Sequence, residues 1–288
     1  MIAIIKKELR QYFYSMVGFV FLAFFLAIVG LYTWAGNLAG GIGNFELTLG
    51  NMTFIYVILI PILTMRIMAE ENKQRTDQLL YTSPISLTKV IVGKYLAVMS
   101  LFTITILIVA LYPLIISQYG QDVRLSLAYS SLIGFYLLGA ANIAIGVFIS
   151  SLTESQVIAA VVSFIVLLMS NMLTSIASML PSDSTAQAII IALIWLVVCA
   201  IAYNMMGNMT VTVILAVIGE AVVWGIFIAK RSLYENLLVK ISEVFAITSR
   251  YSDFELGILD YDAIIYYLSV SFLFLFLTVQ IIKKKRFN

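Results

Sequence analysis

The 288-residue chain is 62% hydrophobic and only 11% charged. Soluble globular domains carry about 25% charged residues, so this composition excludes an ordinary soluble domain and a disordered chain. The net charge of +2, from 17 Lys and Arg against 15 Asp and Glu, does not indicate a nucleic-acid partner. With no histidine and one cysteine, Cys199, the chain lacks a thiolate metal cage, an intramolecular disulfide and the commonest general base. We therefore expect no metal, no cofactor and no catalytic residue.

Eight apolar segments are long enough to cross a membrane, since a spanning helix needs about 20 residues. None alternates with a period of two, which favours helices over barrel strands. The segments cover residues 16–34, 51–67, 91–116, 125–150, 157–180, 188–205, 211–229 and 263–282. We predict an all-α polytopic protein of the cell membrane, with about eight hydrophobic helices in one transmembrane domain over residues 1–288.

The N-terminal residues 1–14 precede the first span and are amphipathic. Basic side chains alternate with apolar residues at helical spacing, namely Ile2, Ile5, Leu9, Tyr12 and Phe13. This pattern indicates a helix in the cytoplasmic interface, although a plain extension of the first span would also fit. A secretory signal does not fit, because the apolar run from Met16 is long enough to span and no convincing cleavage site closes it.

The orientation follows from Lys and Arg in short loops, which prefer the cytoplasm. With eight spans and the N-terminus inside, twelve of the 17 basic residues lie inside, so both termini are predicted to be cytoplasmic. A seven-span arrangement gives the same count, because it exchanges four charges in the 230–250 loop for four in the C-terminal tail. The charges therefore orient the first half of the chain and leave the last third open.

Residues 188–229 are predicted to form a hairpin. One continuous helix would be about 63 Å long, roughly twice the bilayer. Asn204, Gly207 and Asn208 near the middle favour a turn. One interrupted pass or a re-entrant segment remains an alternative.

Glu220 is the only ionisable residue that we predict in the interior of a span, which makes it a functional candidate. The alternatives are a protonated or hydrogen-bonded structural carboxyl, or one near the outer interface. The following extracytoplasmic loop, 230–261, has apolar residues at helical spacing. It is predicted to hold an interfacial helix. A more specific alternative is a docking surface for an accessory extracytoplasmic protein.

The cytoplasmic loop 68–90 concentrates the charge. Its first part is polar and its second part carries Leu79, Leu80 and Tyr81, which indicates a short helix ending near Ser83 because Pro84 disfavours helix in the residue before it. Such a helix is either a solvated connector or a docking element for a cytoplasmic protein.

A family pattern bears on this choice. The run Glu70-Glu71-x4-Thr76-x2-Leu79-Leu80-x-Thr82-Ser83-Pro84-Ile85, followed by Gly93-Lys94, resembles the cytoplasmic loop of type-2 ABC transporter permeases, notably the gliding-associated exporter branch. Arg75 stands where those relatives usually have glycine. In relatives this loop forms the coupling helix that seats in a groove of the ATP-binding subunit. The resemblance implies a contact patch made of Glu70, Glu71, Arg75, Thr76, Leu79, Leu80 and Pro84.

Two further segments are similar to this family. Residues 150–156 resemble the loop before its fifth helix, and Phe254-x2-Gly257-Ile258-x-Asp260-x-Asp262-x3-Tyr266 resembles the approach to its last helix. Ser151-x-x-Glu154 ahead of an apolar run predicts a capping box, and Glu154 is a candidate for a second contact with the ATPase. The 188–229 hairpin is then an addition to a six-helix core.

The resemblance implies the permease subunit of an ATP-driven exporter in a plasma membrane, namely the inner membrane of a bacterial cell. The chain has no P-loop, so separate ATP-binding cassette subunits would supply the energy. Other implied partners are membrane lipid and a second permease copy or a related permease. Small residues for close helix contacts, between copies or within one, are Gly134, Gly139, Ala140, Ala141 and Gly146. The alternatives are an ion-coupled secondary transporter or channel, and a membrane anchor without transport; the substrate stays open.

Overall fold

The computed structural model describes residues 1–75, 86–119 and 124–287, and this part of the chain is helical without a strand. The all-α prediction is confirmed. The helices form two compact units, which are described separately: unit 1 comprises Met1–Asn171 and Ile247–Asn288, and unit 2 comprises Met172–Ala246.

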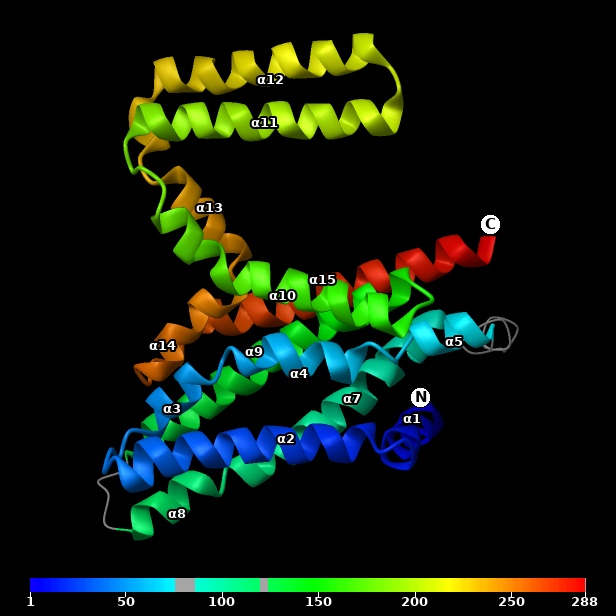
Figure 1. Cartoon of the computed structure of the whole chain (residues 1–288), viewed down its shortest axis with the longest axis vertical. Coiled ribbons are helices and arrows are strands. Elements are labelled where there is room, and N and C mark those ends of the chain that lie inside the picture. Colours follow the sequence, from blue (N-terminus) through cyan, green and yellow to red (C-terminus); the bar gives the residue numbers. More distant parts are fainter. Residues whose placement is uncertain (76–85, 120–123, 288) are drawn as a thin grey trace. The chain divides into compact units, whose positions relative to one another are not determined.

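Unit 1 begins with α1, which covers the residues of the predicted interfacial helix, and continues into the spanning helices (Figure 1). Its elements are α1 (Ile2–Tyr14), α2 (Val17–Tyr32) with the π-helical η1 (Thr33–Ala39), α3 (Phe45–Asn51), α4 (Ile55–Thr64), α5 (Ala69–Gln74), α7 (Leu87–Val109), α8 (Tyr112–Gln118), α9 (Leu125–Leu152), α10 (Gln156–Ser178, whose end belongs to unit 2), η3 (Ile247–Tyr251), α14 (Ser252–Glu255) and α15 (Tyr261–Phe287).

Within the described residues, seven helices are long and apolar enough to cross a membrane, and a bent pair brings the number to eight. The seven are Val17–Ala39, Leu87–Gln118, Leu125–Leu152, Gln156–Ser178, Ser184–Tyr203, Met209–Ala229 and Tyr261–Lys285. The predicted span 51–67 is the exception, because Phe45–Asn51 and Ile55–Gln74 meet at 63°. The bend falls at residues 52–54, just after Gly50 and Asn51 and at the start of the predicted span, so the apolar run that follows it did not reveal it.

Helix α9 is the centre of unit 1 and packs against α4, α7 and α15. An aromatic cluster fills the contact: the Tyr56 and Phe135 ring centroids lie 4.6 Å apart, and Phe102 and Phe25 pack beside them. Tyr56 donates a hydrogen bond of 2.8 Å to the Phe135 carbonyl oxygen. The cluster therefore buries aromatic area without leaving the phenol unpaired.

The glycines of α9 serve packing within the chain. A Cβ atom on Gly134 would lie 2.3 Å from Phe254, one on Gly139 would lie 2.4 Å from Phe102, and one on Gly146 would lie 2.2 Å from Thr64 Oγ1. The small residues were candidates for helix contacts either between two copies or within one copy. In the structure, these glycines make contacts within one copy.

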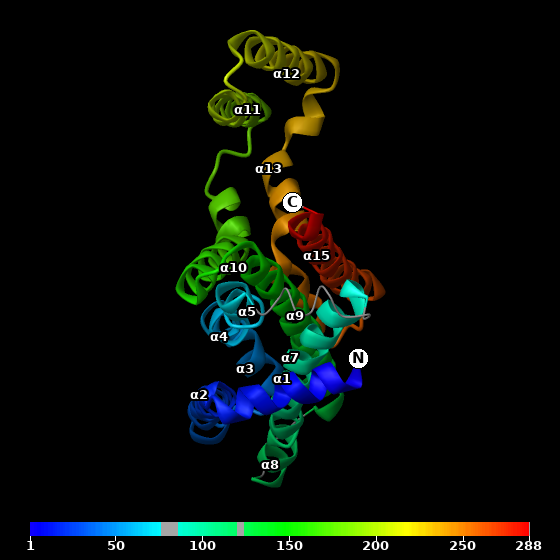
Figure 2. The same ribbon diagram turned by 90° about the vertical axis from the view of Figure 1, so that its right-hand side faces the viewer.

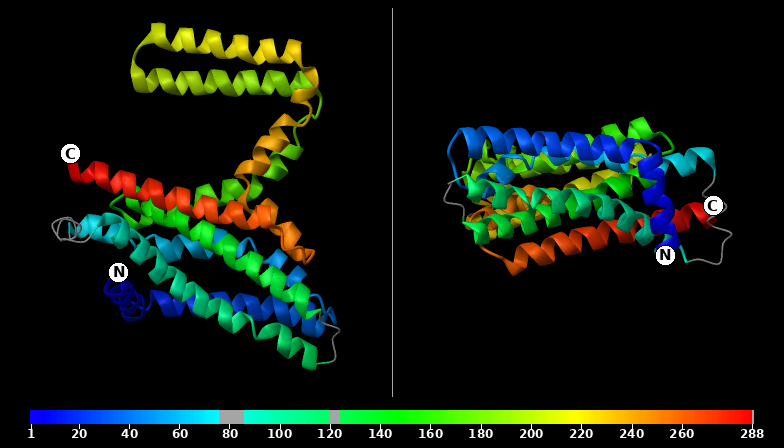
Figure 3. Two further views of the ribbon diagram at one scale, coloured as in Figure 1. Left: turned by 180° about the vertical axis from the view of Figure 1, so that it is seen from behind. Right: turned by 90° about the horizontal axis from the view of Figure 1, so that it is seen from below.

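The two ends of unit 1 differ in content. Helices α1 and α5, the 152–155 loop and both chain termini lie at one end (Figures 1 and 3). Helices α3, α8 and α14 lie at the opposite end (Figure 1). Helix α1 packs across α7 at the first end (Figure 2).

Unit 2 contains the predicted hairpin. Helices α11 (Ser184–Met206) and α12 (Met209–Ala229) pack side by side and are followed by η2 (Arg231–Tyr234) and α13 (Leu237–Phe245). Gly207 has a φ of 63°, which glycine adopts at low cost, and the Asn208 side chain caps α12 by accepting from the Thr210 and Val211 amides. The turn therefore has the residues that the sequence predicted for it.

Candidate functional site

The start of α7 carries a buried charge where α1 crosses it. The Lys94 residue is only 2% exposed. The preceding residue, Gly93, lets α1 come close, because a Cβ atom there would lie 3.2 Å from Ile4 Cγ2. The Gly93-Lys94 pair thus combines a close helix crossing with a cation directly beside it.

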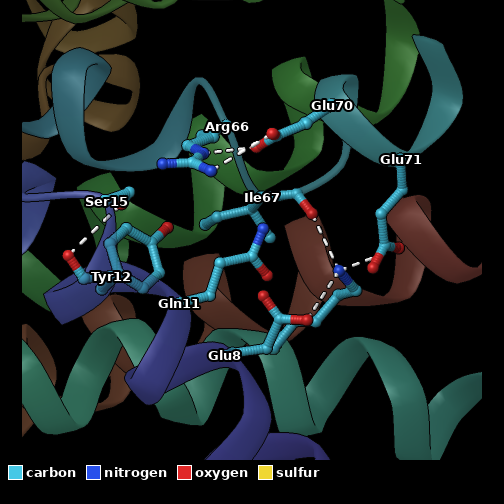
Figure 4. Close-up of a pocket in the computed structure, with 9 residues that line it drawn as sticks. Glu8, Gln11, Tyr12, Ser15, Arg66, Ile67, Glu70 and Glu71 are labelled. Carbon is cyan, nitrogen blue, oxygen red and sulfur yellow. Dashed lines mark hydrogen bonds and ion pairs between the residues drawn. The ribbon is translucent and has the colours of Figure 1, made fainter. Parts of the chain in front are cut away.

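Three acceptors surround the Lys94 ammonium group (Figure 4). Nζ lies 3.2 Å from Glu8 Oε1 on α1 and 2.9 Å from Glu71 Oε2 on α5. It also donates a hydrogen bond of 2.9 Å to the Ile67 carbonyl oxygen. An ammonium group has three N–H donors, so each has a partner, as a buried charge requires.

Lys7 adds a second, more exposed cation to the same carboxylates. Its Nζ lies 3.2 Å from Glu71 Oε1 and 3.5 Å from Glu8 Oε1. Partial burial works to lower the pKa of Lys7, but the two carboxylates outweigh burial and raise the pKa above its usual value. We call Lys7, Glu8, Glu71 and Lys94 the ion network; it holds two cations and two anions.

A neighbouring pair secures the segment that leads into α5. Arg66 donates hydrogen bonds from both Nε and Nη2 to the carboxylate of Glu70, which lies four residues later in the chain. Tyr12 on α1 donates a hydrogen bond of 2.9 Å to the Leu63 carbonyl oxygen, and burial raises its pKa, so the phenol remains a neutral donor. The cavity among these residues and the ion network is about 20 Å³, which accommodates about one water molecule. It is not a substrate chamber.

Helix α5 is also tied to the end of α9. The Ser150 hydroxyl accepts hydrogen bonds of 3.2 Å from the Met68 and Ala69 amides and donates one of 3.1 Å to the Met65 carbonyl oxygen. Asn72 on α5 donates to the Thr153 carbonyl oxygen at 3.2 Å. The two loops that were singled out in the sequence, 68–90 and 150–156, therefore meet in the structure.

The tail of α15 reaches the same place, since Lys285 Nζ donates a hydrogen bond of 2.8 Å to the Ser151 carbonyl oxygen. This end of unit 1 thus joins α1, α5, α7, α9 and α15 through polar contacts.

Comparison with protein families supplies the context for this geometry. Residues 36–230, more than half of the chain, match the family model described as ABC-2 family transporter protein. The chain belongs to the ABC-2 transporter family. Comparison with curated proteins and comparison with solved structures each found no match.

As an ABC-2 permease, the protein is a multi-pass component of the plasma membrane and not itself the catalytic subunit. Membership implies association with ATP-binding cassette subunits. Among the residues that the structure describes, no group of three or more His, Cys, Asp and Glu side chains is placed to hold a metal ion.

The structure describes four of the eight predicted contact residues of the permease. Glu70 and Glu71 are held by Arg66 and by the two lysines, so their carboxylates are occupied within the chain. Arg75 and Glu154 are exposed. Thr76, Leu79, Leu80 and Pro84 lie outside the described residues.

The backbone conformation at Arg75 shows why relatives usually have glycine at this position. It ends α5 with a φ of 55°, in the left-handed region where glycine is favoured. The glycine usual in relatives fits this position, whereas arginine bears a cost of about 1–2 kcal/mol.

The predicted capping box is wrong. Ser151 lies inside α9, and its hydroxyl donates to the Phe148 carbonyl oxygen. The helix boundary falls later, so Thr153 Oγ1 accepts from the Ser155 amide and Ser155 Oγ accepts from the Ile158 amide at 3.5 Å. Helix α9 extends beyond the apolar segment used to place its end, which shifted the expected cap.

The prediction that Glu220 alone is ionisable inside a span is also wrong, because Lys94 lies within the predicted segment 91–116 and is buried. Glu220 itself accepts a hydrogen bond of 3.1 Å from Trp224 Nε1 on its own helix. Sequence reasoning missed Glu8 and Ser150 as partners of the loop. A signal for Glu8 was present: it is the single acidic residue among the basic residues of 1–14.

Proposed function

We propose that this permease is the membrane subunit of an ATP-driven exporter, similar to the gliding-associated branch, and that ATP-binding subunits dock at the end of unit 1 that holds α5. The observation that carries the proposal is the ion network, which links the loop predicted to contact the ATPase to the spanning helix α7 and to α1. Exposed Arg75 and Glu154 at this end support a docking surface.

The network supports transmission because it resists separation. Moving α5 away from α7 would part Glu71 from Lys94, which is 2% exposed, and would strand a charge away from water. The Ser150 hydrogen bonds add a second attachment, to α9. A displacement of α5 by a closing ATPase is therefore passed to α1, α7 and α9 as one body.

The charges support a cytoplasmic location for this end. Lys6, Lys7 and Arg10 lie on α1, and Arg66 and Lys73 lie on or beside α5. Such a concentration of basic side chains favours the cytoplasmic side. Since both termini lie at this end, we propose that both are cytoplasmic.

The passage would lie between this permease and a second copy or a related permease. Packing within unit 1 already occupies the glycines of α9, so the contact between permeases would use other helices. We also propose that an accessory protein binds the 230–261 loop. The proposed location of the permease is a bacterial inner membrane.

Cross-linking tests the docking surface. Lys73 on α5 is exposed and can be changed to cysteine in a chain whose single native cysteine is replaced, Cys199→Ala. A maleimide–photoreactive reagent at position 73 should capture the ATP-binding subunit in the purified complex. The matched control is Leu256→Cys, exposed at the opposite end of unit 1. Capture from position 256 and not from position 73 would refute the proposed orientation.

ATP hydrolysis tests the transmission. Glu71→Gln keeps the shape of the side chain and removes the charge that faces Lys94. We expect the ATP-binding subunit to remain bound while its stimulation by the permease falls severalfold. Unchanged stimulation by Glu71→Gln, with assembly intact, would contradict a role for the ion network in coupling.

A further inference from the structure

Helix α1 packs on the protein with one face and leaves the other face open. The packed face carries Glu8 and Tyr12, which are both buried. The open face lines a shallow hollow together with Gln11, and its exposed residues are Ala3, Lys6, Lys7, Arg10 and Tyr14. These five follow the helical repeat, in which residues three and four positions apart are neighbours. We call Lys6, Lys7, Arg10 and Tyr14 the basic stripe.

Two of the three cations in the basic stripe have no carboxylate partner. Lys7 already pairs with Glu71 and Glu8 in the ion network. Lys6 and Arg10 form no ion pair with any residue that the structure describes. Glu8 does not compensate them on the open face, because it is the single acidic residue of α1 and is buried in the ion network. The stripe therefore exposes positive charge that the described chain does not balance.

The spacing of Lys6 and Arg10 suits a phosphate group. They lie four residues apart on a helix, so their side chains can reach the same anion. Arg10 Nη2 donates a hydrogen bond of 3.2 Å to Tyr14 Oη, and the Arg10 Cζ atom lies 5.3 Å from the centre of the Tyr14 ring. This contact orients the guanidinium group, whose planar set of N–H donors matches the oxygens of a phosphate. Lys6 adds a second, more flexible cation about one turn away.

Apolar side chains beside the stripe favour a lipid phosphate over a soluble one. Ile2 on α1 is exposed, as are Met16 and Phe19 at the start of α2 and the Tyr14 ring. Helix α1 also runs across α2 rather than along it (Figures 2 and 3). A helix that lies across the spans and exposes basic and apolar side chains together fits the interface between headgroups and acyl chains. A soluble anion has no acyl chains to cover these apolar residues.

We propose that the basic stripe binds the phosphate of an anionic phospholipid through Lys6 and Arg10, with the Tyr14 ring at the level of the headgroup. A zwitterionic lipid carries its own cation, which cancels much of the attraction to the two basic side chains. Phosphatidylglycerol has no such cation, and each basic residue near the membrane surface contributes to binding an anionic lipid. The site therefore selects for headgroup charge. This binding does not depend on ATP coupling.

Lipid retention by the purified full chain tests the site. The permease without its ATP-binding subunit is placed in nanodiscs of equal phosphatidylglycerol and phosphatidylcholine, and the lipids that it retains on release are counted by native mass spectrometry. We expect the wild type to retain phosphatidylglycerol preferentially, and Lys6→Gln combined with Arg10→Gln to lower that preference at least tenfold. The matched control is Lys73→Gln combined with Lys89→Gln. It removes two exposed cations of α5 and α7 that lie outside the stripe, and it should keep the preference.

Two measurements on the wild type add to this comparison. Salt screens the attraction to exposed cations, so the preference for phosphatidylglycerol should fall severalfold when NaCl rises from about 50 mM to about 500 mM. An excess of soluble glycerol phosphate at matched ionic strength should leave the retained lipid unchanged, because the acyl chains hold the lipid at the interface. These measurements decide if Lys6→Gln combined with Arg10→Gln does not insert.

Four results would overturn the proposal. The first is a wild type without preference for phosphatidylglycerol, and the second is a preference that salt does not lower. The third is an equal loss in both double variants, which would indicate a general attraction to basic charge and no site on α1. The fourth is displacement by glycerol phosphate, which would assign the stripe to a soluble anion. If the wild type shows no lipid preference and the Lys6 and Arg10 variant loses its ATP-binding subunit, the stripe contacts that protein and not lipid.

Discussion

Lys94→Met removes the buried cation of the ion network and keeps a side chain of similar length. Removing one member of a buried charge pair costs about 3–5 kcal/mol, because the partner charges remain away from water. Lys7 stays within 3.5 Å of both carboxylates, but its side chain is 60% exposed, so its compensation is limited to about 1 kcal/mol. We therefore expect the free energy that holds α1 and α5 on α7 to fall by about 3 kcal/mol.

Hydrogen exchange measures this change locally. A loss of about 3 kcal/mol corresponds to roughly 150-fold faster exchange through local opening, since each 1.4 kcal/mol is about tenfold. The effect should appear in peptides from residues 2–14 and 69–74. The matched control is Lys89→Met, an exposed lysine on the same helix. Equal protection in Lys94→Met and wild type, or an equal loss in Lys89→Met, would refute the reasoning.

Three other substitutions probe separate contacts. Ser150→Ala removes the acceptor for two amides at the start of α5, so the free energy of α5 docking should fall by about 1 kcal/mol, seen as faster exchange in residues 69–74 while residues 2–14 stay protected. Gly146→Ala places a Cβ atom 2.2 Å from a Thr64 atom, and overpacking should lower the unfolding free energy by about 1–3 kcal/mol; an unchanged detergent-unfolding midpoint would contradict the close packing. Because burial raises the pKa of Glu255 in the folded state, the folded chain binds this proton more tightly, and wild-type stability falls as the pH rises above the ordinary value of 4.5. Glu255→Gln should lack this fall, so its unfolding midpoint should exceed that of the wild type at neutral pH, and the difference should close below pH 4.5.

The predicted hairpin and the ion network differ in how far they could be predicted. The hairpin depends on nearby residues: Gly207 adopts positive φ and Asn208 caps the next helix, and both are local preferences. The ion network depends on residues 64 and 86 positions apart, Lys7 with Glu71 and Glu8 with Lys94. No spacing rule within one helix connects them.

The bend between α3 and α4 shows a second limit. The apolar run that marks the span begins only at the bend, because α3 before it carries Glu46, Gly50 and Asn51, so hydropathy does not say whether α3 continues the axis of α4. Which of the two forms depends on the neighbours, here α9 and α14, against which α3 packs.

The amino-acid sequence alone was enough to predict a helical membrane protein, the positions of its apolar segments and the loop that has the family pattern. It did so because water and lipid act on each segment independently of the others. Packing between distant segments was needed to show that Lys94 is buried between Glu8 and Glu71 and that Ser150 holds the start of α5. These features depend on which helices touch, and helix contacts arise from close packing between segments that are distant in the sequence.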